Sequence, residues 1–262
     1  MAEARKWRSW GRRLTWAAAV LAFGAIAAAL IAAVGSGQEW WHFRAGIRAL
    51  RYTFYAAGAG VLVDLVAMFT RRRGGAGVGL ANIVSLLAAL GFMAYLGNLY
   101  LTAQRVPPIH DVTTNLDDYP RFYRLRVRDD NLKTVPVPGR PDLEPLPPRE
   151  RWRALHRQAY GDLQTVRVPW PVAETVQRAA ELARERGWEI VTVDTMQGIL
   201  EAVDTSRFFR FKDNIIVRVR PITGGGQGSM VDMRSISRVG VSDIGVNARR
   251  IRSFLADLQR GV

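Results

Sequence analysis

Residues 14–34 read LTWAAAVLAFGAIAAALIAAV, a stretch without a charged residue that is rich in alanine, leucine, isoleucine and valine. A helix rises about 1.5 Å per residue, so about 20 apolar residues cross the hydrocarbon core of a bilayer. Two further apolar stretches follow at about 50–69 and 78–101. Because hydrocarbon offers no water to backbone polar groups, each stretch is predicted to be a transmembrane helix. The alternative, a buried helix of a soluble protein, is not typical of three such stretches in series.

Basic residues flank these stretches unevenly. The N-terminal tail holds five of them and the loop after the second stretch holds Arg71–Arg73, whereas the longer loop after the first holds Arg44 and Arg48 with Glu39. The positive-inside rule therefore predicts a cytoplasmic N-terminus and an extracytoplasmic C-terminal part. We expect a multi-pass protein of the bacterial inner membrane. A cleaved signal peptide at the first stretch is the alternative, and it would leave the C-terminal part on the same side.

The composition narrows the classes of partner. The net charge is +14, yet residues 105–262 hold 26 basic and 20 acidic residues and no recognisable nucleic-acid module. A basic extracytoplasmic surface suits anionic lipid or an acidic envelope polymer, so the predicted partners are the bilayer, envelope proteins, and an anionic lipid or apolar ligand. There is no cysteine, and His42, His110 and His156 lack ligand spacing, so we predict no disulfide, no metal site and no cofactor.

The remainder of the chain divides into a connector at 105–160 and a soluble domain at 161–262. The connector is rich in proline, contains turns at 111–115 and 117–120, and ends in a short helix at 149–160. The domain is predicted to have an α+β fold, an antiparallel sheet with two helices packed on one face. Its predicted strands are 163–168, 188–194, 199–205, 213–221 and 230–237, with a glycine-rich loop at 224–228, and its predicted helices are 171–186 and 244–260, the last capped by Ser242 or Asp243.

Three motifs carry a family resemblance. They are DVTTN at 111–115, TSRFFRFKD at 205–213, and VDMRSISRVG at 231–240 followed by SDIGVNARRI at 242–251. Together they resemble the bacterial and plastid family catalogued as domain of unknown function 1499, over about residues 105–262. Where that family has Tyr-Pro-Asp ahead of its first strand, this chain has Tyr160-Gly161-Asp162. The resemblance implies a membrane-associated protein and brings no established activity, cofactor or catalytic residue.

Polar side chains gather where the last predicted strand meets the last predicted helix. A helix N-terminus offers free amide donors and a positive dipole end, so this corner could hold an anion or another ligand. The structural alternative is a buried arginine–aspartate network with a helix cap, which we favour. Asp213 and Asp232 are expected to pair with nearby arginines, Arg207, Arg218 or Arg234, in the same way. The candidate ligand residues are Arg234, Ser237, Arg238, Asp243, Asn247 and Arg250.

Asp64 lies inside the second apolar stretch. An ionisable residue in a membrane span is a functional candidate by default, here for a transport or proton-relay role. The alternative is structural, because Asp64 could pair with Arg71–Arg73 or accept hydrogen bonds from Asn82 and Ser85 on the third helix. No second acidic residue lies in the spans to form a relay.

Phe208, Phe209 and Phe211 stand close together in the sequence. Core packing is the plain interpretation of these rings. The alternative is an apolar pocket between the sheet and a helix that accepts a lipid tail or another apolar ligand.

Two classes of function remain. The favoured one is a non-catalytic envelope protein whose three helices anchor a domain with a binding or interaction role. The alternative is a hydrolase or transferase acting at the membrane surface, with its site near the last strand and last helix. The sequence contains no nucleophile elbow, catalytic triad, metal motif or phosphate loop for such an enzyme.

Overall fold

The computed structural model describes residues 2–223 and 226–261. Gly224 and Gly225 of the predicted glycine-rich loop lie outside the described residues. The chain forms two compact units, residues 1–101 with 207–210, and residues 102–206 with 211–262. The second unit therefore includes the predicted connector at 105–160 and the domain at 161–262, except for residues 207–210. The two units are described separately below.

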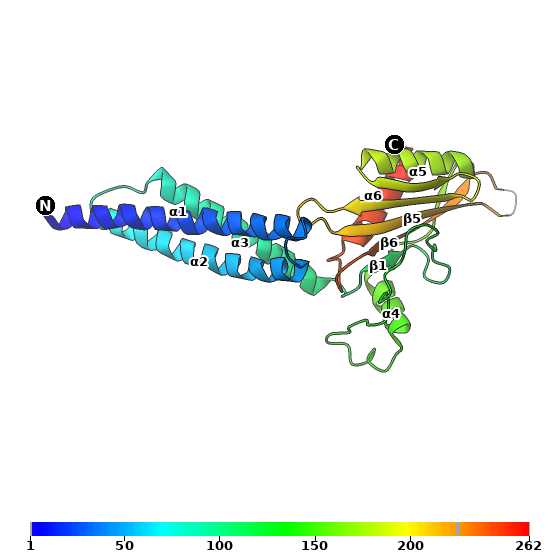
Figure 1. The fold of residues 1–262 in the computed structure, drawn as a ribbon, viewed down its shortest axis with the longest axis horizontal. Coiled ribbons are helices and arrows are strands. Elements are labelled where there is room, and N and C mark those ends of the chain that lie inside the picture. Colours follow the sequence, from blue (N-terminus) through cyan, green and yellow to red (C-terminus); the bar gives the residue numbers. More distant parts are fainter. Residues whose placement is uncertain (1, 224–225, 262) are drawn as a thin grey trace. The chain divides into compact units, whose positions relative to one another are not determined.

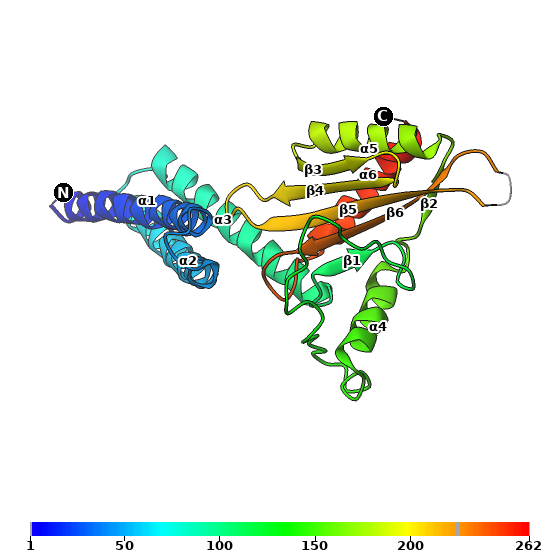
Figure 2. The ribbon, with the colours of Figure 1, turned by 45° about the vertical axis from the view of Figure 1, so that its right-hand side comes forward.

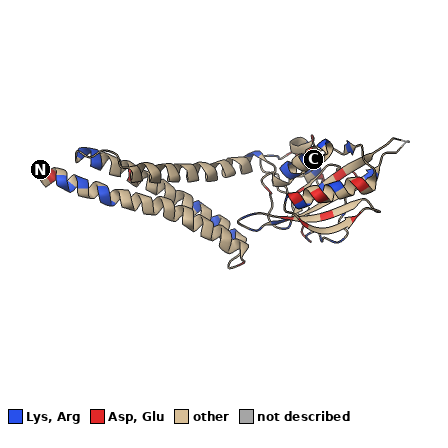
Figure 3. Cartoon of the chain, turned by 90° about the horizontal axis from the view of Figure 1, so that it is seen from above, with Lys and Arg blue, Asp and Glu red and all other residues tan. Residues whose placement is uncertain are grey.

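Three helices make up most of the first unit: α1 (Ala2–Gly37), α2 (Phe43–Arg73) and α3 (Leu80–Arg105), drawn in Figure 1. Each is long and apolar enough to cross a membrane, as predicted. The helices extend beyond the apolar stretches because arginine and lysine are good helix formers. In Figure 3 the Lys and Arg residues of these helices gather toward helix ends.

Small residues let α1 and α2 approach closely. Ala18, Ala22, Ala25 and Ala29 form a buried stripe on α1. A side chain at Gly60 of α2 would meet this stripe, since a Cβ there would lie 3.4 Å from the Ala22 nitrogen. Close backbone approach maximises van der Waals contact, which drives helix association in lipid. Packing of small residues therefore holds this helix pair together.

The second unit is built on a six-stranded antiparallel sheet. The strand order is β1-β6-β5-β4-β3, and β2 also pairs with β6 (Figure 2). Helices α5 and α6 pack over the sheet, and α4 lies in the predicted connector (Figure 1). The predicted α+β class is confirmed. The elements are β1 (Asp111–Thr113), α4 (Pro148–Tyr160), β2 (Val166–Val168), α5 (Val172–Glu185), β3 (Glu189–Asp194), β4 (Ile199–Thr205), β5 (Lys212–Pro221), β6 (Ser229–Ser237) and α6 (Val246–Arg260).

Alternation along the strands gives the sheet two different faces. Leu200, Val217 and Met233 are register partners across β4, β5 and β6, and all three are fully buried in the apolar core with residues of α5 and α6. One position along, Glu201 and Arg234 flank Ile216 on the opposite face. Successive side chains of a strand point to opposite faces of the sheet. The pairing register of the strands therefore determines which side chains lie on each face.

The prediction of a turn at 111–115 was wrong in part, because residues 111–113 form the edge strand β1. Asp111 is the register partner of Ile236 on β6, and Thr113 is the partner of Arg234. Two side chains of α4 bond the outer edge of β1. Trp152 Nε1 donates to the Asp111 carbonyl at 2.7 Å, and the Thr113 amide donates to His156 Nε2 at 3.1 Å. Helix α4 thus provides hydrogen-bond partners for backbone groups that would otherwise be unpaired on an edge strand.

Candidate functional site

Four of the six predicted ligand residues meet at the start of α6. Asn247 donates from Nδ2 to Ser237 Oγ and to the His110 carbonyl, each at 3.0 Å. Its Oδ1 accepts a hydrogen bond from Ser235 Oγ at 2.6 Å and another from Arg250 Nη1. Asn247 is fully buried. Its amide therefore joins β6, the segment before β1 and α6 into one closed network.

Arg250 carries the charge of this network. Its Nη2 donates to Asp204 and to Asp213, each at 2.7 Å, and its Nε donates to Asp204 at 3.1 Å. Only 7% of the Arg250 side chain is exposed. Two carboxylates face one guanidinium, so the positive charge that an anionic ligand would need is already compensated.

Asp243 occupies the N-terminus of α6. Its Oδ1 accepts the Gly245 amide and its Oδ2 accepts the Asn247 amide, each at 2.8 Å. Gly245 is the residue in the N-cap position, with a φ of 71° that glycine adopts without strain. Burial raises the pKa of the Asp243 carboxyl above its ordinary value. The amide donors expected to attract an anion thus bind a carboxylate of the chain itself.

Arg234 and Arg238 do not join this network, which corrects the prediction that all six residues gather. Both follow the alternation of β6 to the opposite face from Ser235 and Ser237. Arg234 binds Asp111 through two hydrogen bonds of 2.9 and 2.7 Å and donates to the Pro120 carbonyl at 3.1 Å. Arg238 donates to Asn214 Oδ1 at 2.7 Å.

Asp232 forms a second buried charge network. Its carboxylate is fully buried and accepts hydrogen bonds from Thr114 at 3.2 Å and Thr165 at 2.5 Å. Arg218 and Arg220 donate to it at 2.9 and 2.8 Å and also pair with Asp118. The sequence suggested Arg218 but not Arg220. Asp232 therefore serves a different arginine network from Asp213, which pairs with Arg250.

Glu201 was missed by the sequence analysis. It is fully buried in the middle of β4, and it accepts backbone amides from Tyr123, Arg124 and Leu125, the last two at 3.0 and 2.9 Å. A carboxylate inside an apolar strand requires such donors. The glutamate within the otherwise largely apolar strand ILEAVDT could have indicated a buried carboxylate. Its hydrogen-bond donors could not have been predicted, because they are main-chain amides that no sequence pattern identifies.

The side chains of His156 and Tyr160 are almost fully buried on α4. Burial lowers the pKa of His156 to about 4 and raises the pKa of Tyr160 to about 12. Within the described residues, His156 Nδ1 and the Tyr160 hydroxyl have no hydrogen-bond partner. Both residues are neutral at pH 7, which suits a packing role beside β1.

A surface groove lies where α6 passes the ends of β3 and β4. Its volume is about 370 Å³, and three arginines and one aspartate contribute its charge. Arg249 is exposed, and its guanidinium donates to the Ile244 carbonyl at 3.1 Å. Of the predicted ligand residues only Arg250 lines it. The lining residues are Arg186, Trp188, Asp204, Val246, Arg249, Arg250 and Ser253.

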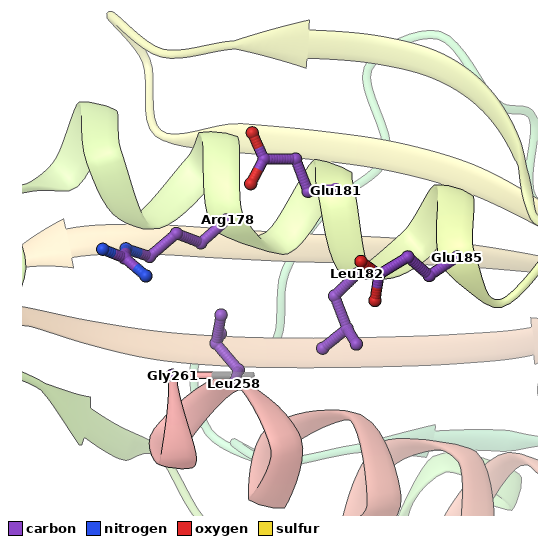
Figure 4. Close-up of a pocket in the computed structure, with 6 residues that line it drawn as sticks. All are labelled: Arg178, Glu181, Leu182, Glu185, Leu258 and Gly261. Atoms are coloured by element: carbon purple, nitrogen blue, oxygen red, sulfur yellow. The ribbon is translucent and has the colours of Figure 1, made fainter.

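A smaller cavity of about 80 Å³ lies between α5 and α6 (Figure 4). Arg178, beside it, pairs with Glu174 at 2.9 Å and stacks over Trp170. A water molecule takes up about 30 Å³, so this cavity suits solvent rather than a ligand.

Elsewhere, the described residues bring together no group of three histidine, aspartate or glutamate side chains that could hold a metal ion.

The phenylalanines at 208, 209 and 211 are not part of the described apolar core. They lie in the loop between β4 and β5, and 45% of Phe208 is exposed. The loop is closed by the Phe211 amide, which donates to Ser206 Oγ at 2.8 Å. The prediction of core packing was wrong for Phe208, because β4 ends before this ring and β5 begins after it. For Phe209 and Phe211, which are half-buried, it stays a prediction.

Asp64 forms a polar cluster inside the helical unit. Its side chain is 1% exposed and accepts hydrogen bonds from Asn82 at 2.7 Å and Ser85 at 2.5 Å. Thr15 donates to Asn82 Oδ1 at 3.1 Å, which extends the cluster from α2 and α3 to α1. The contacts expected with Asn82 and Ser85 are therefore present, and they join α1, α2 and α3.

The family model described as a protein of unknown function, DUF1499, matches residues 111–258. The match covers more than half of the chain and contains all six strands of the sheet. The chain therefore belongs to this family, as the resemblance of its motifs predicted. No curated protein shows significant similarity to the chain.

Proposed function

We propose that this DUF1499 protein is an integral membrane protein that presents its α+β domain outside the cytoplasm of a bacterial cell. The domain binds a negatively charged partner in the cell envelope and performs no chemistry on it. Three apolar helices support the anchoring role, and the distribution of basic residues supports the orientation.

The groove beside α6 is the observation that carries the binding role. Among the described residues, Arg249 is the lining arginine without a carboxylate partner, whereas Arg186 pairs with Asp257 and Arg250 with Asp204 and Asp213. Trp188 and Val246 add apolar surface. A concave site that combines apolar surface with a few placed charges is typical of ligand binding. The uncompensated charge of Arg249 favours an acidic segment of a partner.

The buried networks argue against chemistry elsewhere in the domain. Arg234, Arg250 and Asp232 each have their charge compensated by neighbours of the same chain. A catalytic group must reach a substrate atom directly or through one water. If Asp243 or Asn247 is exchanged for an isosteric residue, we therefore expect a change in the stability of the domain and no loss of an enzymatic activity.

Cysteine labelling tests the orientation, because the chain contains no cysteine of its own. Met196→Cys introduces a thiol at a side chain that is 93% exposed, and Gly77→Cys places one in the loop between α2 and α3 where a Cβ meets no atom within 4 Å. A membrane-impermeant maleimide should label Cys at 196 in intact cells, and Cys at 77 only after permeabilisation. The reverse pattern would place the domain in the cytoplasm.

Binding is tested with the full chain in detergent micelles and fluorescein-labelled poly-glutamate as the probe. Arg249→Gln should weaken binding several-fold, and added salt should weaken it further because it screens exposed charges. Arg167→Gln removes the same charge from an exposed position on β2 outside the groove lining and should have little effect. Equal losses in the two variants would contradict a specific role for the groove.

A further inference from the structure

The domain begins very close to the last membrane helix. Only residues 106–110 separate the end of α3 from β1. Five extended residues span at most about 18 Å. The chain therefore tethers the start of β1 within reach of the bilayer surface at which α3 ends.

The strand register defines what else lies at that end of the sheet. Asp111 is the register partner of Ile236, Ile236 of Asn214, and Asn214 of Val203. The start of β1 thus lies level with the end of β6, the start of β5 and the end of β4. Two loops leave the sheet here, residues 238–245 between β6 and α6 and residues 206–211 between β4 and β5, of which 207–210 group with the helical unit.

These loops expose apolar side chains. Phe208 is 45% exposed, Val239 37% and Val241 50%, and Val246 at the start of α6 is 39% exposed. They are four of the seven large apolar side chains found exposed among the described residues after 101. Single exposed apolar residues are ordinary, but a group at one end of a domain marks an interaction surface.

Basic residues accompany the apolar ones. Residues 206–212 read SRFFRFK, with three basic residues and no acidic one. Arg207, Arg210 and Lys212 are exposed, and the Arg207 guanidinium stacks over the Phe208 ring at 5.6 Å. Aromatic rings favour the headgroup level of a bilayer, and nearby arginine and lysine side chains are attracted to anionic lipids.

We propose that this end of the domain, formed by residues 206–212 and 238–242, is a membrane-contact surface. Phe208 and Val241 enter the headgroup region of the bilayer that α3 crosses, and Arg207, Arg210 and Lys212 bind the phosphates of anionic lipids. This contact does not depend on what the groove beside α6 binds.

Site-specific fluorescence in vesicles tests the contact. Phe208→Cys, Val241→Cys and Met196→Cys are labelled with an environment-sensitive nitrobenzoxadiazole dye in the full chain, reconstituted into phosphatidylcholine with phosphatidylglycerol. Met196 lies in the turn between β3 and β4, at the opposite end of the sheet, and serves as the matched control. Spin-labelled lipids should quench the dye at 208 and 241 several-fold more than at 196. Equal quenching at all three positions would overturn the proposal.

The role of charge is tested in the same vesicles. Arg207→Gln combined with Lys212→Gln should reduce quenching at 241, whereas Arg167→Gln combined with Arg184→Gln, which removes two exposed charges elsewhere, should not. Vesicles of phosphatidylcholine alone should give weaker quenching of the dye at 208. If neither the charge substitutions nor the change of lipid alters the quenching, the proposed binding of anionic lipid is overturned. If the dye is shielded from water but spin-labelled lipids do not quench it, the surface contacts protein and the proposal of a membrane contact is overturned.

Discussion

One face of the sheet is filled with aliphatic side chains under α5 and α6, whereas the other carries buried charges under an irregular segment, residues 114–126. On the first face Leu200, Val217 and Met233 are fully buried among apolar neighbours. On the second, Glu201 is equally buried and Arg234 is 4% exposed. Both faces exclude water, but they are stabilised by different interactions.

The difference lies in how strictly each contact is specified. Apolar burial is non-directional, so the first face requires volume and pattern. A buried charge requires partners in fixed positions, because an unpaired one is costly. The segment 114–126 supplies those partners: backbone amides for Glu201, the Pro120 carbonyl for Arg234 and the Asp118 carboxylate for Arg218. A segment without regular structure thereby becomes part of the core.

Breaking the Arg234–Asp111 pair should have the largest effect. Arg234→Met leaves the fully buried Asp111 carboxylate without its guanidinium, and we expect the free energy of unfolding to fall by about 3–5 kcal/mol. Urea unfolding of the full chain in micelles, followed by tryptophan fluorescence, measures this loss. Replacing both members, with Asp111→Leu added, should cost less than the single change. If the double variant is less stable than the single one, the loss of stability in Arg234→Met does not arise from the unpaired Asp111 carboxylate.

A cavity on the apolar face should cost somewhat less. Met233→Ala, at the neighbouring position on β6, removes a fully buried side chain and should lower the free energy of unfolding by about 3 kcal/mol. Met233→Leu keeps the volume and should cost less than about 1.5 kcal/mol. The same unfolding measurement checks both. Equal losses from the two variants would mean that this face also demands a specific side chain.

The polar side should also give the domain a dependence on pH. His156 has its pKa lowered from 6.5 to about 4 by burial, so it stays neutral in the folded domain while it gains a proton on unfolding below pH 6.5. The unfolded state then binds more protons, and stability falls as pH falls. Between pH 7 and pH 5 the loss from this residue should be about 2 kcal/mol. In His156→Gln that part of the pH dependence should vanish, and an unchanged pH profile would rule out His156 as its source.

The smallest effect concerns the cap of α6. Asp243→Ala removes the acceptor for the Gly245 and Asn247 amides and should cost about 1 kcal/mol. Gln259→Ala, at an exposed position near the other end of the helix, should change stability by no more than about 0.5 kcal/mol. Urea unfolding distinguishes the two. A cost of Asp243→Ala as large as that of Arg234→Met would indicate a wider role for this carboxylate.

Patterns with a fixed period were sufficient to predict much of this protein. The three apolar stretches predicted three helices, and alternation in residues 199–205 and 213–221 located β4 and β5 to within one residue. The motifs of the last strand and last helix identified the family. These features depend on hydrophobicity and on its local period, and both can be read from residues that are neighbours in the chain.

The candidate site depended on register, which only the tertiary structure decides. Residues 111–113 contain too few residues to show alternation, and they became β1 because β6 and α4 bind their backbone on both sides. Arg234 and Arg250 are close in the sequence, yet the pleat of β6 sends Arg234 to the opposite face, where Asp111, distant in the chain, binds it. The sequence by itself determined the helices and the strands other than β1. Long-range pairing determined which charges meet, because the distance between two charges depends on strand order and not on their separation in the chain.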